Sequence, residues 1–256
     1  MKYTSIPIFS TSIGKKILMA LSGLFLCTFL VVHLIGNLQL FKSDQGFAFN
    51  MYARFMTTNP LIKTVAYVNY ALILLHVFTS LFLTLSNRKA RPVQYGYNNP
   101  VANSIWSSRN MGILGTIILV FIVVHMQNFW YEYKFGEVPV ASYYEYISPE
   151  GKSMTTDNIE TVPPESYATV RMIYIKDLYK EVITEFNQEI LLVILYVIAQ
   201  IAIGFHLWHG FSSAFQTLGM NHKKYTPVIQ SLGYGFSVII PLLFAIMPLY
   251  FYFIHK

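Results

Sequence analysis

Long apolar segments alternate with shorter polar ones along this chain, and the alternation predicts five membrane-spanning helices. Acidic and basic side chains gather towards the ends of the apolar segments. A helix needs about 20 residues to cross a bilayer, and each segment is long enough. The predicted spans cover residues 14–41, 61–87, 109–132, 189–219 and 227–254. We therefore expect an all-α integral membrane protein whose single transmembrane domain covers residues 1–256.

The polar segments between the spans differ in length. The longest covers residues 133–188 and contains the turn sequences SPEGKS and VPPES. Gly and Pro in such sequences favour turns, and the later sequence IKDLYKEVITEF predicts a helical lead-in to the fourth span. We expect 133–188 to form a long polar extracytoplasmic loop. A short amphipathic helix that ends before Pro60 is predicted between the first two spans.

The charged residues are few and are distributed unevenly. They make up 12% of the chain, against about 25% in soluble domains. One side of the predicted bundle holds nine basic residues and no acidic ones, and the other holds nine basic and all twelve acidic residues. Because short basic loops mark the cytoplasmic side, the N-terminus is predicted to be cytoplasmic and the C-terminus extracytoplasmic. The net charge of +6 follows from this topology, and we expect no nucleic-acid binding.

Each of the first four predicted spans contains at least one histidine. They are His33, His76, His125, and, in the fourth span, His206 and His209. A buried imidazole in lipid is costly unless something binds it. The sequence FLVVH ending at His33 returns as FIVVH ending at His125, and Gly23 and Gly115 each precede their histidine by ten residues. This repeated setting indicates a shared role.

The depths of the histidines place them in two layers. At about 1.5 Å of helix per residue, His33 and His125 lie roughly 12 and 10 Å from the outer ends of their spans. His76 and His206 lie on spans of opposite direction, roughly 22 and 25 Å from the same side. We call the first two the outer pair and the second two the inner pair. Two such pairs suit two haems, each iron taking a neutral imidazole on either face.

The sequence lacks the ligand patterns of other common cofactors. Cys27 is the single cysteine and lies inside the first span, so the chain has no internal disulfide and no CxxCH sequence for covalent haem. There is no glycine-rich phosphate loop and no iron–sulfur cysteine set. A haem-free alternative is a transporter or proton channel that uses the histidines as relays. It predicts a colourless protein, and the repeat here is parallel, unlike the inverted repeats of many transporters.

Each of the first four spans contributes one characteristic fragment: SGLFLCTFLVVHL, LLHVF, GTIILVFIVVH and FHLWHGFSSAF. In their order, spacing and depth these fragments resemble a known family, the dihaem cytochrome b membrane anchors of succinate dehydrogenases and fumarate reductases. The similarity is to the single-chain, five-helix form found in bacteria and covers most of the chain outside 133–188.

The resemblance implies ligands, cofactors and partners. His33 with His125 would bind the haem far from the cytoplasmic subunits, and His76 with His206 the near one. His206 stands four residues before Gly210, as the family's fourth ligand does. The cofactors would be two haem b and menaquinone. A flavoprotein subunit and an iron–sulfur subunit would dock on the cytoplasmic face of the bacterial inner membrane. The chain would pass electrons between them and menaquinone, while succinate would bind elsewhere.

Two positions depart from the family pattern. Some members carry a glutamate two residues before the fourth ligand, where this chain has Gly204, so a proton pathway through that position is in doubt. Some members also carry a glutamate in the first outer loop near the quinol site. Asp44 is the only acidic residue in that loop here.

Several polar residues near the two layers are candidate contacts of the cofactors. Ser22, Arg109 and His209 lie towards the inner layer and are candidate partners of haem propionates. Asn37, Gln39 and Asn128 lie just outside the outer layer and are candidate partners of quinone carbonyls. Ordinary interfacial polar residues are the alternative interpretation of the last three. The same four-histidine arrangement also serves membrane anchors of nitrate reductase, formate dehydrogenase and hydrogenase, whose soluble partners differ.

Overall fold

The computed structural model describes residues 11–90, 92–93 and 99–254 and is mostly helical. Within them five helical segments are long and apolar enough to cross a membrane, which confirms the number and order of the predicted spans. They cover Ser12–Phe41, Pro60–Lys89, Met111–Phe135, Ile190–Thr217 and Thr226–Phe253. Both chain ends, whose sides of the membrane the charges predict, lie outside the described residues.

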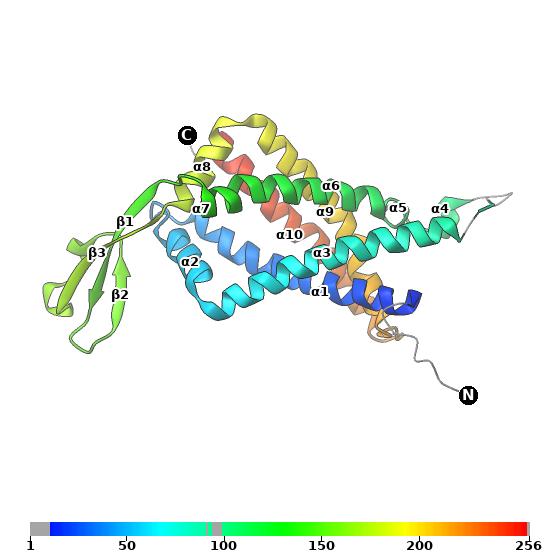
Figure 1. Ribbon diagram of the computed structural model, residues 1–256, viewed down its shortest axis with the longest axis horizontal. Helices are drawn as coiled ribbons and strands as arrows, with labels where there is room; N and C mark the ends of the chain where they lie inside the picture. The colour runs from blue at the N-terminus through cyan, green and yellow to red at the C-terminus, as the bar shows by residue number, and fades with distance from the viewer. Residues whose placement is uncertain (1–10, 91, 94–98, 255–256) are drawn as a thin grey trace.

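The five segments contain the main helices of the bundle (Figure 1). The first and third segments are composite, because their C-terminal ends change from α-helical to 3-10 or π-helical geometry. The elements are α1 (Ser12–Asn37) with η2 (Leu38–Phe41), α3 (Pro60–Lys89), α6 (Met111–His125) with η3 (Met126–Tyr131) and α7 (Glu132–Phe135), α9 (Ile190–Thr217), and α10 (Thr226–Phe253). Two short helices, α4 (Pro100–Asn103) and α5 (Trp106–Arg109), precede α6.

Local signals explain where α3 begins. The Asn59 side chain accepts hydrogen bonds from the backbone N–H groups of Leu61 and Ile62, which would otherwise lack partners at the helix start. Pro60 occupies the first helical position, where its missing N–H costs nothing. The chain therefore ends the preceding helix and starts the second span within a few residues, as the sequence predicts.

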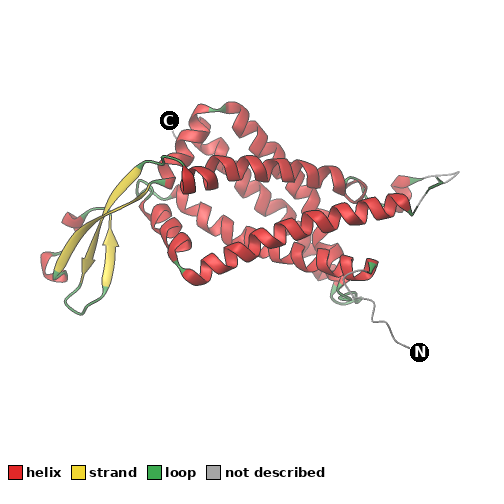
Figure 2. Ribbon diagram, viewed as in Figure 1, coloured by secondary structure: helices red, strands yellow, loops and turns green. Residues whose placement is uncertain are grey.

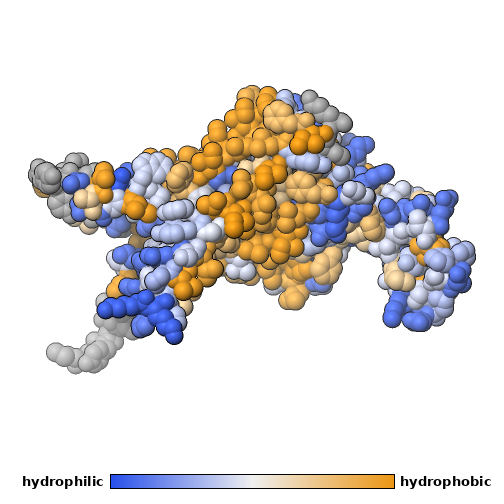
Figure 3. All heavy atoms as spheres, turned by 180° about the vertical axis from the view of Figure 1, so that it is seen from behind, coloured by the Kyte–Doolittle hydropathy of each residue, from blue (hydrophilic) through white to orange (hydrophobic). Residues whose placement is uncertain are grey.

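The helices α1, α3, α6 and α9 surround the histidine layers, and α10 packs against α9. The helix α1 packs on α3 and α9, whereas α6 packs on α9 and more lightly on α3. Consequently α1 faces α6 across the bundle, and α3 faces α9. The helix α10 packs along α9. On the face seen in the space-filling view, apolar residues cover the middle of the bundle and polar residues gather towards both ends (Figure 3).

The segment between the third and fourth spans contains a small sheet, so the fold is mostly helical and not all-α. Its strands are β1 (Val140–Ile147), β2 (Ser153–Thr156) and β3 (Thr169–Lys176), in the antiparallel order β2-β1-β3. The sheet projects from one end of the bundle (Figure 2). The predicted turn SPEGKS joins β1 to β2. The predicted helical lead-in is α8 (Leu178–Gln188), but its first two residues belong to β3.

A buried amide ties the sheet to the helices beside it. Asn50 lies on α2 (Phe47–Thr58), the predicted short amphipathic helix, and is only 1% exposed. Its side chain donates to the Tyr143 hydroxyl at 2.9 Å and to Asp177 Oδ1 at 2.7 Å, and it accepts from the backbone N–H of Tyr179 at 2.9 Å. One residue therefore joins α2, β1 and the start of α8. We call α2, the sheet and α8 the outer cap.

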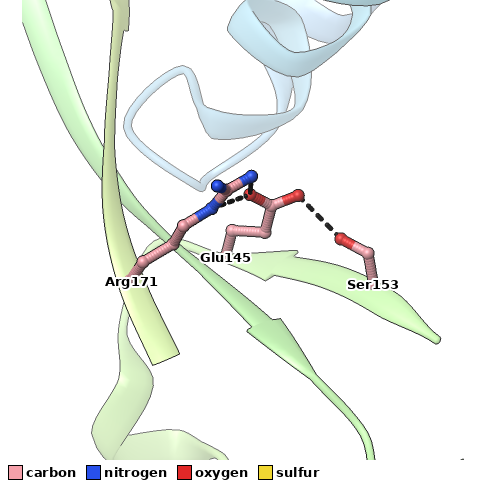
Figure 4. Close-up of polar contacts among 3 residues, drawn as sticks. All are labelled: Glu145, Ser153 and Arg171. Atoms are coloured by element: carbon pink, nitrogen blue, oxygen red, sulfur yellow. Dashed lines mark hydrogen bonds and ion pairs between the residues drawn. The ribbon is translucent and has the colours of Figure 1, made fainter. Parts of the chain in front are cut away.

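The sheet carries an ionic contact that makes its stability depend on pH (Figure 4). Glu145 on β1 accepts a hydrogen bond from Ser153 Oγ at 2.7 Å and pairs with the Arg171 guanidinium on β3. The Ser153 hydrogen bond, followed by Arg171, holds the pKa of Glu145 below its ordinary value. These contacts stabilise the sheet above the pKa of an unfolded glutamate, about 4.3, and are lost as pH falls through the lowered pKa of the folded state.

We expect Glu145→Gln to destabilise the sheet at neutral pH, so that protease cleavage within it becomes faster. The cleavage rate should also vary less with pH than in wild type. Protease cleavage within 140–176, compared at several pH values between 3 and 7, measures the effect relative to wild type. Glu150→Gln is the matched control, because the Glu150–Lys152 pair is highly exposed and such pairs contribute little. A Glu145→Gln profile with the pH dependence of wild type would contradict the assignment.

Candidate functional site: two histidine pairs in the bundle

The structure brings the predicted outer pair together. His33 of α1 and His125 of α6 face one another across the bundle, with ring centres 5.7 Å apart and ring planes at 86°. Aromatic rings surround both imidazoles: Phe29 and Phe244 lie beside His33, and Phe121 and Phe129 beside His125. The surroundings are therefore apolar, as a porphyrin plate requires.

The structure also brings the predicted inner pair together. His76 of α3 and His206 of α9 lie with ring centres 6.3 Å apart and ring planes at 62°. Each pair thus joins helices that face each other across the bundle. The Nδ1 atom of His206 is buried and has no hydrogen-bond partner among the described residues. Such a group calls for an explanation, since buried polar atoms are nearly always bonded.

The distance between the two pairs follows from residue spacings along three helices. On α1, Ser22 contacts His76 and lies 11 positions before His33, which is about 16 Å of helix. On α9, Tyr196 contacts His125 and lies ten positions before His206, or about 15 Å. On α6, Gly115 faces His206 and precedes His125 by ten positions. The three helices agree, so the pairs form two layers about 15 Å apart along the helices.

The glycines of the sequence repeat lie against the inner pair. A Cβ atom on Gly23 would be 3.3 Å from His76 Cε1, and one on Gly115 would be 3.9 Å from His206 Cε1. In each half of the bundle, one helix therefore places a glycine beside an inner histidine and, ten residues later, contributes an outer histidine. The repeat seen in the sequence has this structural meaning: α1 with α3, and α6 with α9, are two similar helix pairs.

Two hydroxyl groups hold one histidine of each pair. Ser22 Oγ lies 3.0 Å from His76 Nδ1, and the Tyr196 hydroxyl lies 3.1 Å from His125 Nδ1. Both hydroxyl-bearing residues are buried, at 2% and 5% exposed. A metal-ligating histidine usually uses its second nitrogen in this way, which fixes the ring orientation and tautomer. The contacts leave Nε2 of each ring free to bind.

The geometry of both pairs fits a metal held between two imidazoles. Two bonds of about 2 Å each, together with the distance from each nitrogen to its ring centre, separate the ring centres by roughly 6 Å. In the structure the ring centres of the two pairs lie 5.7 and 6.3 Å apart. Among the described residues, no group of three or more His, Cys, Asp or Glu side chains is arranged to hold a metal ion. Each pair offers two ligands, so further ligands would come from a macrocycle such as porphyrin.

The contact between α3 and α6, which each carry one histidine, is light. Asn69 and Thr79 are the buried residues of α3, and Leu114 and Phe121 those of α6. By contrast, α9 has eight buried residues. Loose packing between α3 and α6 allows a broad flat group to bind between the helices. Gly23 and Gly115, which place no side chain beside the inner histidines, also favour such a group.

The other candidate residues lie near the layers but do not form one cluster. Ser22 contacts His76, whereas Arg109 is exposed and its guanidinium donates to the Ser104 carbonyl. His209 lies half-buried on α9. The Asn37 side chain donates to the His33 carbonyl at 2.8 Å. Gln39 is half-buried in η2, and Asn128 donates to Glu185 Oε2 on α8. Within the described ranges, no hydrogen bond joins Asn37, Gln39 and Asn128.

Tyr196 is the functional candidate that sequence reasoning misses. A tyrosine in an apolar span resembles any other aromatic core residue, and only its contact with His125 distinguishes it. One signal was available: Tyr196 precedes His206 by ten residues, the same interval that separates each repeated glycine from its histidine. The π-helical segment η3, which begins just after His125, is a second missed feature of a kind often found at functional sites.

Comparison of the chain with family models, with curated proteins and with solved structures gave no match.

The contact between Gly23 and His76 predicts a cost for adding a side chain there. Gly23→Val places atoms against the His76 ring, and overpacking of this kind costs about 1–3 kcal/mol. We expect a lower thermal midpoint in detergent. Gly235→Val is the matched control, because a Cβ on this glycine in the middle of α10 meets nothing within 4 Å. Equal destabilisation by the two substitutions would contradict the proposed close approach of α1 to His76.

Proposed function

We propose that this chain is the membrane anchor and electron-transfer subunit of a succinate:quinone oxidoreductase, with two haem b groups held by its histidine pairs. The observation that carries the proposal is the pairing of four histidines from facing helices at two depths. A relay of titratable groups needs no such pairing, whereas a six-coordinate iron with a porphyrin needs two opposed nitrogens. The choice of succinate chemistry rests on the resemblance of the four sequence fragments.

The residues of the chain would each have a defined part in this function. His33 and His125 would hold one haem, and His76 and His206 the other, each through a neutral imidazole nitrogen. When bound, the haems supply one-electron carriers at two depths of the membrane. The protein positions them, surrounds them with apolar side chains and tunes them through its hydrogen bonds. Asn37, Gln39 and Asn128 lie at the outer end, where menaquinone carbonyls would find amide donors.

The partners would dock at the end of the bundle away from the sheet. In the described residues that end carries Lys15, Lys16, Arg88, Lys89, Arg109, Lys223 and Lys224. Basic residues of this kind mark the cytoplasmic side, where an iron–sulfur subunit and a flavoprotein subunit would meet the inner haem. The proposed location is the bacterial inner membrane, with the N-terminus cytoplasmic, the C-terminus extracytoplasmic and the outer cap on the extracytoplasmic side.

A reduced-minus-oxidised absorption spectrum with haem quantitation tests the proposal. We expect two haem b per chain in wild type and about one in each of His33→Ala and His76→Ala, since each substitution removes one ligand of one pair. His222→Ala is the control: this exposed histidine lies between α9 and α10, outside the two layers, and its loss should keep both haems. A colourless wild-type protein would contradict the proposal and favour histidine relays in a channel or transporter.

The soluble partners decide between succinate chemistry and related reactions. Purification of the complex from membranes should yield a flavin-containing subunit that oxidises succinate with a quinone acceptor. Co-purification of a molybdenum or nickel subunit instead would assign the chain to the anchors of nitrate reductase, formate dehydrogenase or hydrogenase. In that case the haem assignment would stand and the succinate assignment would fall.

A further inference from the structure

We infer that Ser22 and Tyr196 are positioning residues that set the electron-transfer properties of the inner and outer pairs separately. This inference rests on the proposed function, because it concerns how the chain holds the two irons. It assigns each hydroxyl to one histidine, one layer and one centre. Neither residue would touch the iron, and each would act through the imidazole that it holds.

The contacts of Ser22 favour one direction for its hydrogen bond to His76. Ser22 Oγ lies 2.8 Å from the Leu18 carbonyl oxygen and 3.1 Å from that of Met19. Both carbonyl oxygens are acceptors for the single hydroxyl proton. With that proton donated within α1, the Ser22 oxygen accepts from His76 Nδ1–H. The lone pair of Nε2 is therefore available to a metal.

Tyr196 holds His125 from a rigid position. Its ring packs against Phe121, Phe129 and Phe186, with ring centres 4.9, 6.3 and 5.1 Å away. These contacts fix the phenol oxygen beside His125 Nδ1. A phenol both donates and accepts, so with a metal on Nε2 the ring proton would lie on Nδ1 and His125 would donate to the Tyr196 oxygen. This is the same tautomer in which Ser22 would hold His76.

The two hydroxyls act on different layers and from different helices. Ser22 comes from α1 and holds the histidine of its neighbour α3, whereas Tyr196 comes from α9 and holds the histidine of its neighbour α6. A hydrogen-bond acceptor at Nδ1 makes the imidazole more electron-donating, which stabilises the oxidised iron and lowers its potential. Because the layers lie about 15 Å apart, loss of one hydroxyl should affect one centre and leave the other unchanged.

Potentiometric titration of the purified, haem-containing protein tests the inference. We expect Tyr196→Phe to raise the potential of the outer centre only and Ser22→Ala to raise that of the inner centre only. Each variant should also bind its own haem about 10-fold or more weakly, as loss of such a partner usually does. The two centres are identified beforehand by their absence in His33→Ala and His76→Ala.

Matched variants separate positioning from general damage. Ser237→Ala removes another buried serine, 3% exposed, whose hydroxyl donates to the Tyr234 carbonyl on its own helix. Tyr143→Phe removes another buried tyrosine hydroxyl, the one bonded to Asn50 in the outer cap. Both should leave the two potentials at wild-type values. Ser22→Thr keeps a hydroxyl and should restore the inner potential towards wild type.

Each outcome bears on the inference. A shift confined to the expected centre, or loss of that haem alone, supports it. Unchanged potentials in both variants, equal shifts of both centres, or loss of both haems from either variant would overturn it. A wild-type protein without haem would refute the proposed function itself, which is a separate result from a haem-containing protein whose potentials ignore Ser22 and Tyr196.

Discussion

An imidazole inside an apolar bundle must find partners for its nitrogens, and this requirement shapes the centre of the molecule. The cost of a buried unpaired polar group is about 1–3 kcal/mol, and the bundle contains four imidazole rings in two layers. Ser22 and Tyr196 satisfy one nitrogen each in two of them. Nδ1 of His206 is buried and has no partner among the described residues, so it calls for an additional group. The two histidine pairs are therefore best explained as a binding site for an additional group.

The spacing of the two layers follows from the ten-residue interval between glycine and histidine that occurs in both α1 and α6. Ten residues of helix separate Gly23 from His33 and Gly115 from His125, and this interval is the distance between the layers. The glycines leave room beside the inner histidines, while the histidines that follow them form the outer pair. Because α1 and α6 face each other, one interval used twice places two glycines beside the inner layer and two histidines in the outer layer. The other two histidines, His76 and His206, come from α3 and α9.

The sequence predicts what depends on helical periodicity and misses what depends on particular contacts. The spans and the pairing of His33 with His125 and His76 with His206 were accessible, because helix rise converts spacing into depth. The sheet was missed, since 140–147 and 169–176 lie in a polar segment rich in turn residues. There the strand-favouring Val, Ile and Tyr pair only across a long connection. The sequence does not reveal the role of Tyr196, because that role depends on a single contact between its hydroxyl and His125 Nδ1.

The hydrogen bonds of Asn50 have a consequence for how the chain is assembled. Asn50 is synthesised before α6, α8 and α9, yet its partners Tyr143, Asp177 and Tyr179 lie 93, 127 and 129 residues further along. Domains fold as their residues become available during synthesis, so these three hydrogen bonds form only after the chain has been made as far as Tyr179. Closure of the outer cap thus follows synthesis of the first three spans and does not require α9 or α10, which come later in the chain.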